Sequence, residues 1–180
     1  MRPPTWQRLS VRFPPPEVGL VSDSPDSAIL ELIDGQRSML ISPTVPDMAS
    51  DWVPYAFRHA HPELTDGQSS DSEFLLVVQA AAEPHEREDF RRWLDVEHAP
   101  RQTALPGVNW YVGFEQVGTD HSFLNLWGID DPAIVTGDTW AAVRESPWWD
   151  RVAHIPAAGD RGVYRVTRQP ARADAGGAGA

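Results

Sequence analysis

The sequence contains no cysteine and no lysine, and each absence removes a class of chemistry. Without cysteine the chain has no disulfide bond, no thiolate nucleophile and no cysteine-held zinc or iron–sulfur cluster. Without lysine it can use neither Schiff-base catalysis nor the lysine of a phosphate-binding P-loop. A chain without disulfide bonds suits the reducing cytosol, so we expect a cytoplasmic protein.

Long apolar runs and an excess of positive charge are also missing. No run approaches the roughly 20 apolar residues that span a bilayer, and the proline-rich N-terminus lacks the apolar stretch of a signal peptide. The formal net charge of −11 disfavours binding to phosphate backbones and to anionic lipid surfaces. We therefore expect neither a nucleic acid nor a membrane as partner.

The chain has enough apolar residues for a sizeable core, because 41% of its 180 residues are hydrophobic and eight are tryptophan. Residues 1–72 predict a proline-rich arm with a short strand near 9–13, a hairpin around Asp34-Gly35 and a short helix at 52–59. The polar stretch 65–73 marks a boundary, and residues 169–180 predict a disordered tail.

Residues 73–168 carry a regular alternation of strand and helix patterns. The expected elements are strands at 74–81, 108–117, 123–128 and 162–167, a helix at 84–104, and helical residues 132–153 with a new start at Ser146-Pro147. This βαββαβ order predicts a ferredoxin-like α+β fold with two helices on one face of the sheet. The strands are apolar on both faces, so the open face needs a cover, either a second copy or the N-terminal segment.

The expected first helix and its following turn carry a recognisable pattern. Phe90–Arg101 contains an aromatic, an acid–histidine pair and a proline, and Leu105-Pro106-Gly107-Val108 follows. These residues, with the later Glu145–Trp149, resemble the dimeric α+β barrel superfamily, in particular the EthD-like and antibiotic-biosynthesis-monooxygenase-like proteins. Residues 1–72 lie outside this resemblance and are too short for a second complete βαββαβ unit.

The resemblance implies a pocket, a homodimer and a hydrophobic small molecule as partner. Activities in the superfamily include cofactor-free quinone-forming monooxygenation, polyketide cyclisation, lactone isomerisation and haem-dependent degradation. The leading expectation is a cofactor-independent enzyme of secondary or catabolic metabolism that acts on an aromatic or polyketide-like compound. A non-catalytic ligand-binding protein, a haem-dependent enzyme and a purely structural domain are the alternatives.

His98 is the first candidate catalytic residue. It continues the apolar stripe of Phe90 and Leu94, so it should face the sheet. Pro100 has no N–H to donate to the carbonyl of Val96, which should loosen the turn near His98. A histidine there can act as a general base, or it can fix this corner by a hydrogen bond to the backbone.

The third expected strand supplies the other candidates. Its period of two places His121, Phe123, Asn125 and Trp127 on one face, while Leu124 and Leu126 on the other face suit packing against the helices. Asn125, with Tyr111, is predicted to hold an oxyanion as a catalytic residue. His121, Phe123, Trp127, Trp93 and Trp110 are predicted to bind substrate, and the alternative is that these aromatics are core.

The acids Asp95 and Glu97 and the histidine pair His59 and His61 are expected to have structural roles. Asp95 and Glu97 should form solvated ion pairs with Arg91 and Arg101, which lie four residues away on the helix. His59-Ala-His61 has the spacing of two metal ligands on a strand, but the local pattern indicates a helix end or a loop there. We therefore expect no metal site.

Overall fold

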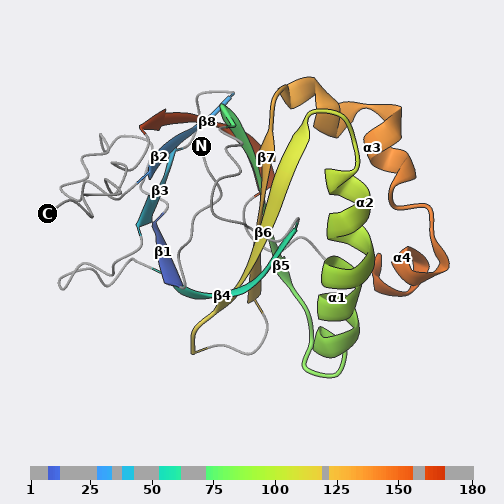
Figure 1. The fold of residues 1–180 in the computed structure, drawn as a ribbon. Coiled ribbons are helices and arrows are strands. Elements are labelled where there is room, and N and C mark those ends of the chain that lie inside the picture. Colours follow the sequence, from blue (N-terminus) through green and yellow to red (C-terminus); the bar gives the residue numbers. More distant parts are fainter. Residues whose placement is uncertain are drawn as a thin grey trace, which may run out of the picture.

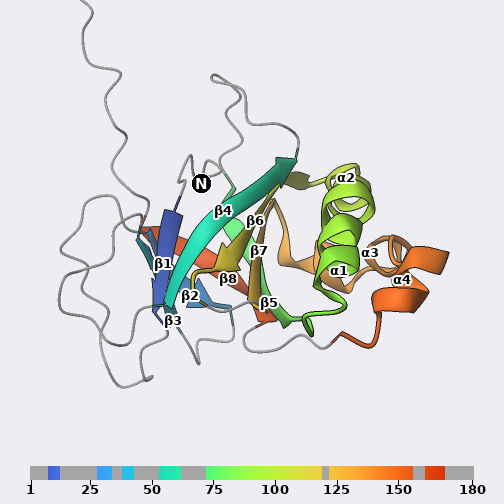
Figure 2. The ribbon, with the colours of Figure 1, turned by 90° about the horizontal axis from the view of Figure 1, so that it is seen from below.

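The computed structural model describes residues 8–12, 28–33, 38–42, 53–61, 72–118, 122–155 and 161–168. The strands of these residues close into a barrel, and the helices lie together on one outer side of it (Figures 1 and 2). The predicted C-terminal tail and most of the predicted N-terminal arm lie outside the described residues.

The second half of the chain follows the predicted order of strands. These are β5 (Phe74–Ala81), β6 (Val108–Gln116), β7 (Ser122–Ile129) and β8 (Arg161–Arg168). They lie side by side as β8-β5-β7-β6, each antiparallel to its neighbours, which is the ferredoxin-like arrangement. The predicted α+β ferredoxin-like fold is confirmed.

The helices of this half match the predicted segments in finer pieces. The first consists of α1 (Arg87–Trp93), the π-helical segment η1 (Leu94–His98) and α2 (Ala99–Thr103), and the second region contains the 3₁₀ helix η2 (Pro132–Thr136), α3 (Asp138–Ala142) and α4 (Pro147–Val152). Ser146 caps α4 as expected, because its hydroxyl accepts a hydrogen bond from the Trp149 N–H at 3.0 Å.

The first half of the chain supplies the other four strands. These are β1 (Arg8–Arg12), β2 (Ala28–Leu32), β3 (Ser38–Ser42) and β4 (Val53–His61). Their spatial order, β4-β1-β3-β2, repeats the order β8-β5-β7-β6 of the second half. The last strand of each half pairs with the second strand of the other, β8 with β2 and β4 with β6. The described strands of residues 1–72 therefore form a second set with the ferredoxin-like order. No helix is described among these residues.

The predicted helix at residues 52–59 is wrong, because residues 53–59 belong to β4 and residue 52 lies outside the described residues. Tyr55 and Phe57 alternate with outward residues and pack in the barrel, while the backbone pairs with β1 on one side and β6 on the other. Pro54 lacks the N–H that a helix interior needs. Long-range strand pairing has overridden the local helix signal, whereas the predicted hairpin of β2 and β3 is confirmed.

The interior of the barrel is one apolar core shared by both halves. Val11, Met39 and Ile41 from the first half meet Val77 and Leu126 from the second. The prediction that Leu124 and Leu126 face the helices is wrong, since both lie in this core. Of the two covers expected for the open sheet face, a second copy or the N-terminal segment, the structure has the N-terminal strands in that place. The homodimer stays a prediction, but an open sheet face no longer argues for it.

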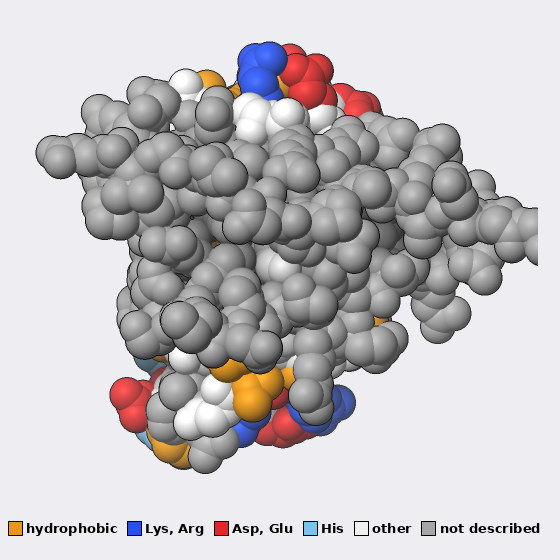
Figure 3. All heavy atoms as spheres, turned by 90° about the vertical axis from the view of Figure 1, so that its left-hand side faces the viewer, with side chains coloured by type: hydrophobic (Ala, Val, Ile, Leu, Met, Phe, Trp, Pro, Cys, Tyr) orange, Lys and Arg blue, Asp and Glu red, His pale blue; other side chains and the backbone are white. Residues whose placement is uncertain are grey.

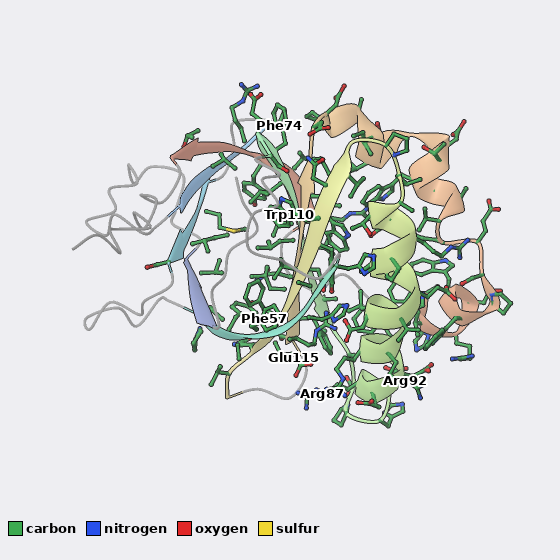
Figure 4. The ribbon with its side chains drawn as sticks, in the orientation of Figure 1. Phe57, Phe74, Arg87, Arg92, Trp110 and Glu115 are labelled. Atoms are coloured by element: carbon green, nitrogen blue, oxygen red, sulfur yellow. The ribbon has the colours of Figure 1, made fainter. Side chains whose placement is uncertain are left out.

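Trp110 shows how tightly the interior is filled. Figure 4 shows Trp110 and Phe57 on the barrel side of the sheet, and Trp110 is fully buried there. The Trp110 ring lies against Gly128 of β7, where a Cβ atom would collide with the indole and with the Ser72 hydroxyl. Trp110 was predicted to bind substrate, but the structure places its ring in the barrel core, where Gly128 leaves room for it.

On the face of the molecule opposite the helices, described basic and acidic side chains lie beside one another at the upper rim (Figure 3). No helix among the described residues is long and apolar enough to cross a bilayer.

Candidate functional site

A cavity of about 230 Å³ lies between the helices and the outer face of the β5–β8 sheet. The sheet contributes Leu76, Val78, Ala80, Asn125, Trp127 and Arg161, and the helical side contributes Phe90, Trp93, Leu94, His98, Gln102, Trp140, Arg144, Trp149, Ala153 and Ile155. The site therefore lies outside the barrel, whose interior is filled by side chains.

The π-helical turn brings His98 into this cavity. The N–H of Ala99 donates to the carbonyl of Leu94, five residues back, so the helix is wider by one residue at this turn. Pro100 follows and has no N–H to donate to Val96, which confirms the predicted loosening. His98 is buried, with its ring stacked on Trp93 at 4.1 Å between centroids and edge-on to Trp127 at 6.0 Å.

The surroundings of His98 disfavour its charged form. Burial, and then the positive charges of Arg144 and Arg101, lower the pKa of His98 from 6.5 to about 3. The imidazole is therefore neutral at neutral pH and a weak base. It can accept or donate a hydrogen bond to a ligand without carrying charge.

Asn125 is held in one orientation by a buried hydrogen-bond network. Its Oδ1 accepts from the Tyr111 hydroxyl at 2.8 Å and from Arg58 Nη2 at 3.3 Å. Its Nδ2 lies 3.4 Å from the carbonyl oxygen of Val78, which leaves the second amide hydrogen for a ligand. Asn125 therefore presents a hydrogen-bond donor to the cavity, and its role in holding an oxyanion stays a prediction.

Tyr111 stands one layer behind the cavity. Its side chain is fully buried and does not line the cavity, and it reaches the site only through Asn125. Burial raises the pKa of Tyr111 to about 12, although the nearby Arg58 charge works in the opposite direction. Tyr111 is therefore a neutral hydroxyl that positions Asn125, and the prediction that it contacts substrate directly is not supported by its place in the structure.

Arg58 is the residue of this network that sequence reasoning missed. It comes from β4 and forms an ion pair with Asp95 of η1, so the predicted pairing of Asp95 with Arg91 is wrong. Burial works against the Arg58 charge, but Tyr111 and Asp95 more than offset this effect and its pKa is raised. The residue was missed because β4 was predicted to be a helix.

Two local features aim Arg58 at the network. Phe57 packs in the barrel, so strand alternation places Arg58 on the outer face, and the register between β4 and β6 shifts at this point, between Phe57 and His59. Gly113 of β6, which pairs with His59, lies against the Arg58 side chain: a Cβ atom at Gly113 would collide with the Arg58 guanidinium and the Tyr111 hydroxyl. The glycine thus leaves room for an arginine to cross the sheet.

Several polar atoms of the cavity wall have no hydrogen-bond partner. They are Nδ1 of His98, Oε1 of Gln102 and the indole nitrogens of Trp127 and Trp140, all buried and all unpaired within the described structure. A buried polar group without a partner costs about 1–3 kcal/mol. Four such groups around one cavity indicate a site built to receive polar atoms of a ligand or of water.

Of the remaining residues predicted to bind substrate, some line the cavity and others do not. Trp93 and Trp127 line the cavity as predicted, whereas Phe123 packs against Phe90 at 5.2 Å between ring centroids. His121 lies outside the described residues. Gln102, Trp140, Arg144, Trp149 and Arg161 also line the cavity and were not predicted to do so. Trp140 and Trp149 were expected to pack in the core, with an aromatic pocket as the alternative, because the sequence does not show which helix face meets the sheet.

Of the groups expected to be structural, Glu97 has its predicted partner, while the histidine pair lies in another element than expected. Glu97 pairs with Arg101 at 3.7 Å, as predicted, and also accepts a hydrogen bond from the Ser146 hydroxyl at 2.5 Å. His59 and His61 lie on β4 rather than in a loop. Among the described residues, no group of three or more histidine, aspartate and glutamate side chains could hold a metal ion.

Comparison with known proteins relates this chain to others through its fold. No protein-family model matches this sequence, and no curated protein matches it. Solved structures do match: the chain has the ferredoxin-like α+β fold that is also seen in proteins related to antibiotic-biosynthesis monooxygenases, which is the fold that the resemblance implied. Nothing among these matches singles out the EthD-like proteins.

Three bacterial structures illustrate the likeness. A monooxygenase-like protein of Listeria innocua has a TM-score of 0.58 and 11% identity, over 88% of this chain and 92% of that one. A ferredoxin-fold protein of Listeria monocytogenes related to antibiotic-biosynthesis monooxygenases has a TM-score of 0.58 and 11% identity, over 89% of this chain and 95% of that one. A haem-degrading enzyme of Listeria monocytogenes has a TM-score of 0.55 and 9% identity, over 88% of this chain and 99% of that one. At these identities the likeness is one of fold.

Proposed function

We propose that the protein is a small-molecule enzyme of the oxygenase type, acting on a hydrophobic aromatic compound held between the helices and the outer face of the sheet. The observation that carries this proposal is the cavity itself, with aromatic walls and four unpaired buried polar atoms. The monooxygenase-like and haem-degrading neighbours support an oxygenase over a cyclase or an isomerase.

Four cavity residues have a role in this proposal. Trp93 and Trp127 pack against the planar substrate, the free Nδ2 hydrogen of Asn125 binds its oxygen, and neutral His98 accepts a hydrogen bond from its hydroxyl. An electron-rich substrate can itself reduce O₂. When a ring CH₂ becomes C=O, one oxygen atom enters the ring and the other leaves as water, so no cofactor is required.

Haem does not fit the cavity as the helices are arranged here. A neutral histidine such as His98 is the form that binds haem iron. The cavity of about 230 Å³ is smaller than the roughly 300–1,000 Å³ of pockets for drug-sized ligands, and a macrocycle needs more. The Trp93 ring also covers one face of the imidazole. We expect added haemin to produce no Soret shift with this protein.

A ligand-binding protein without catalysis is the second candidate, and one observation favours it. With a pKa of about 3, His98 is a poor base at neutral pH, so the cavity lacks a strong proton acceptor among its described residues. This candidate uses the same cavity and the same contacts. It differs from the enzyme only in releasing its ligand unchanged.

The test begins with native mass spectrometry of the purified chain to find a co-purifying compound. That compound is then incubated with fresh protein in air-saturated buffer, and its mass is followed. A gain of one oxygen with loss of two hydrogens supports the oxygenase, while an unchanged compound supports the binding protein.

Variants of the cavity residues test the assigned roles. We expect Asn125→Ala and His98→Phe to lose turnover, whereas Tyr55→Phe, which alters only a barrel-interior hydrogen bond to Gln79, should retain it. Full turnover by both cavity variants would remove the proposed roles.

A further inference from the structure

The charged side chains of the cavity wall are all of one sign. In a chain with net charge −11, the described lining contains two arginines, Arg144 and Arg161, and no acidic residue. We propose that the ligand is an aromatic carboxylate whose anionic group pairs with Arg144 and Arg161. This inference rests on the proposed function and adds the chemical class of the ligand.

Most other described arginines have an acidic partner. The pairs are Arg58 with Asp95, Arg87 with Glu115, Arg91 with Glu88, Arg101 with Glu97, Arg151 with Asp89 and Arg165 with Glu73. Figure 4 shows one of them, Arg87 beside Glu115. Arg144 and Arg161 form no such pair within the described structure, although acidic side chains outnumber basic ones in the chain. A ligand with a carboxylate group would supply the acidic partner for Arg144 and Arg161.

Both arginines are placed at the edge of the cavity by rigid elements. Arg144 follows α3, is partly buried, and has its guanidinium carbon 5.5 Å from the Trp149 ring, which lines the same cavity. Arg161 begins β8 and pairs with Val78 of β5, whose side chain also lines the cavity. One guanidinium thus comes from the helical wall and the other from the sheet.

The pair is electrostatically unfavourable without an anion. Burial, and then the positive charge of Arg161, lower the pKa of Arg144, which means that its surroundings resist its charge. A carboxylate between the two guanidinium groups would relieve both effects and could accept a charge-assisted hydrogen bond from each. The tryptophans of the cavity would then take the ring, so one molecule satisfies the aromatic wall and the two charges.

The test uses two probes of the same shape, 2-naphthoate and its neutral amide, 2-naphthamide. Isothermal titration calorimetry measures their dissociation constants for the full chain and for Arg144→Gln, Arg161→Gln and Arg92→Gln. Arg92 is exposed on α1 outside the cavity, so its variant makes the same charge change as a control. Near-ultraviolet circular dichroism checks that each variant is folded.

We expect the wild-type chain and Arg92→Gln to bind 2-naphthoate at least about tenfold more tightly than 2-naphthamide, as for a charge-assisted contact. Arg144→Gln and Arg161→Gln should each lose most of this preference while still binding the amide. Added salt should weaken binding of the naphthoate alone.

Equal affinity for the two probes in the wild-type chain would overturn the carboxylate inference and leave the proposed function in place. Absence of binding by both probes would overturn the proposed function and the inference with it. A preference for naphthoate that survives both cavity-arginine variants would contradict the assigned residues.

Discussion

In the barrel, the N-terminal strands β1–β4 and the C-terminal strands β5–β8 repeat one spatial order and pair reciprocally at both seams. Both halves bury their inner faces in the same core. They differ outside the barrel, where the described helices all cover the C-terminal half (Figures 1 and 2). The cavity lies under those helices, and among the described residues of the N-terminal half it is Arg58 that reaches the site.

This difference separates two tasks that one sheet can perform. Strands alone close the barrel and bury apolar side chains, which stabilises the fold. A cavity with converging polar groups requires a second layer, because a single exposed sheet face cannot exclude water. The four predictions below, from the largest expected effect to the smallest, test whether the halves are divided in this way.

The largest effect should follow from a cavity in the shared core. Ile41 of β3 is fully buried between the two halves, so Ile41→Ala should lower the free energy of unfolding by about 2–5 kcal/mol. Urea denaturation followed by tryptophan fluorescence measures this loss, and the variant should still unfold in one transition. Ile33→Ala, at a residue that is 48% exposed, is the matched control and should change little. Separate transitions for the two halves would show that they do not share a core.

The next effect concerns pH and the helix-covered site. The pKa of His98 is about 3 in the folded chain and 6.5 in the unfolded chain, so between these values only the unfolded state binds the proton. Stability should therefore fall as the pH falls from about 6.5 towards 3, by about 1.4 kcal/mol for each unit of pH in that window. Urea denaturation at pH 7, 6 and 5 should show this fall in the wild-type chain and a smaller one in His98→Gln. His85→Gln, which removes an exposed histidine, should keep the wild-type slope.

The third effect breaks the contribution of the N-terminal half to the site. Gly113→Ala places a methyl group where the Arg58 guanidinium and the Tyr111 hydroxyl lie, which should cost about 1–3 kcal/mol and displace Asn125. Chemical denaturation and the affinity for 2-naphthamide should both report the loss. Gly137→Ala, whose Cβ would meet only ordinary contacts, is the control. Wild-type affinity in Gly113→Ala would show that Arg58 does not position the site.

The smallest effect sharpens the difference between the inside and the outside of the barrel. Tyr111→Phe removes the hydrogen bond to Asn125, and Tyr55→Phe removes one to Gln79 inside the barrel. Both should lose about 0.5–1.5 kcal/mol of stability. Only Tyr111→Phe should also weaken binding of 2-naphthamide in calorimetry, because only Tyr111 orients a residue of the cavity. Equal affinities in the two variants would place Tyr111 outside the functional network.

Sequence reasoning succeeded where local signals agree with the final environment. The strand at 74–81, the Ser146 cap and the loosened turn before Pro100 were all predicted, since each depends on residues close in the chain. The helix predicted at 52–59 failed because pairing of β4 with two distant strands outweighs local propensity.

Prediction of the site was partial, because the site also depends on contacts between residues that are distant in the chain. His98, Asn125, Trp93 and Trp127 were chosen from periodicity, which shows which residues share a face. Periodicity does not show which face meets the helices, so the aliphatic and aromatic faces of β7 were assigned to the wrong neighbours. The register of β6 was likewise open, and Trp110 proved to point into the barrel.

The amino-acid sequence by itself determined the βαββαβ order, the apolar character of both sheet faces, the exclusion of thiolate and lysine chemistry, and the stripe that carries His98 inward. These follow from composition and from short-range stereochemistry. The tertiary structure alone decided that β1–β4 close the barrel, that Arg58 crosses to Asn125, and that Arg144 and Arg161 meet at one cavity. Those contacts join residues far apart in the chain, and the free energy that selects them comes from packing all strands and helices together.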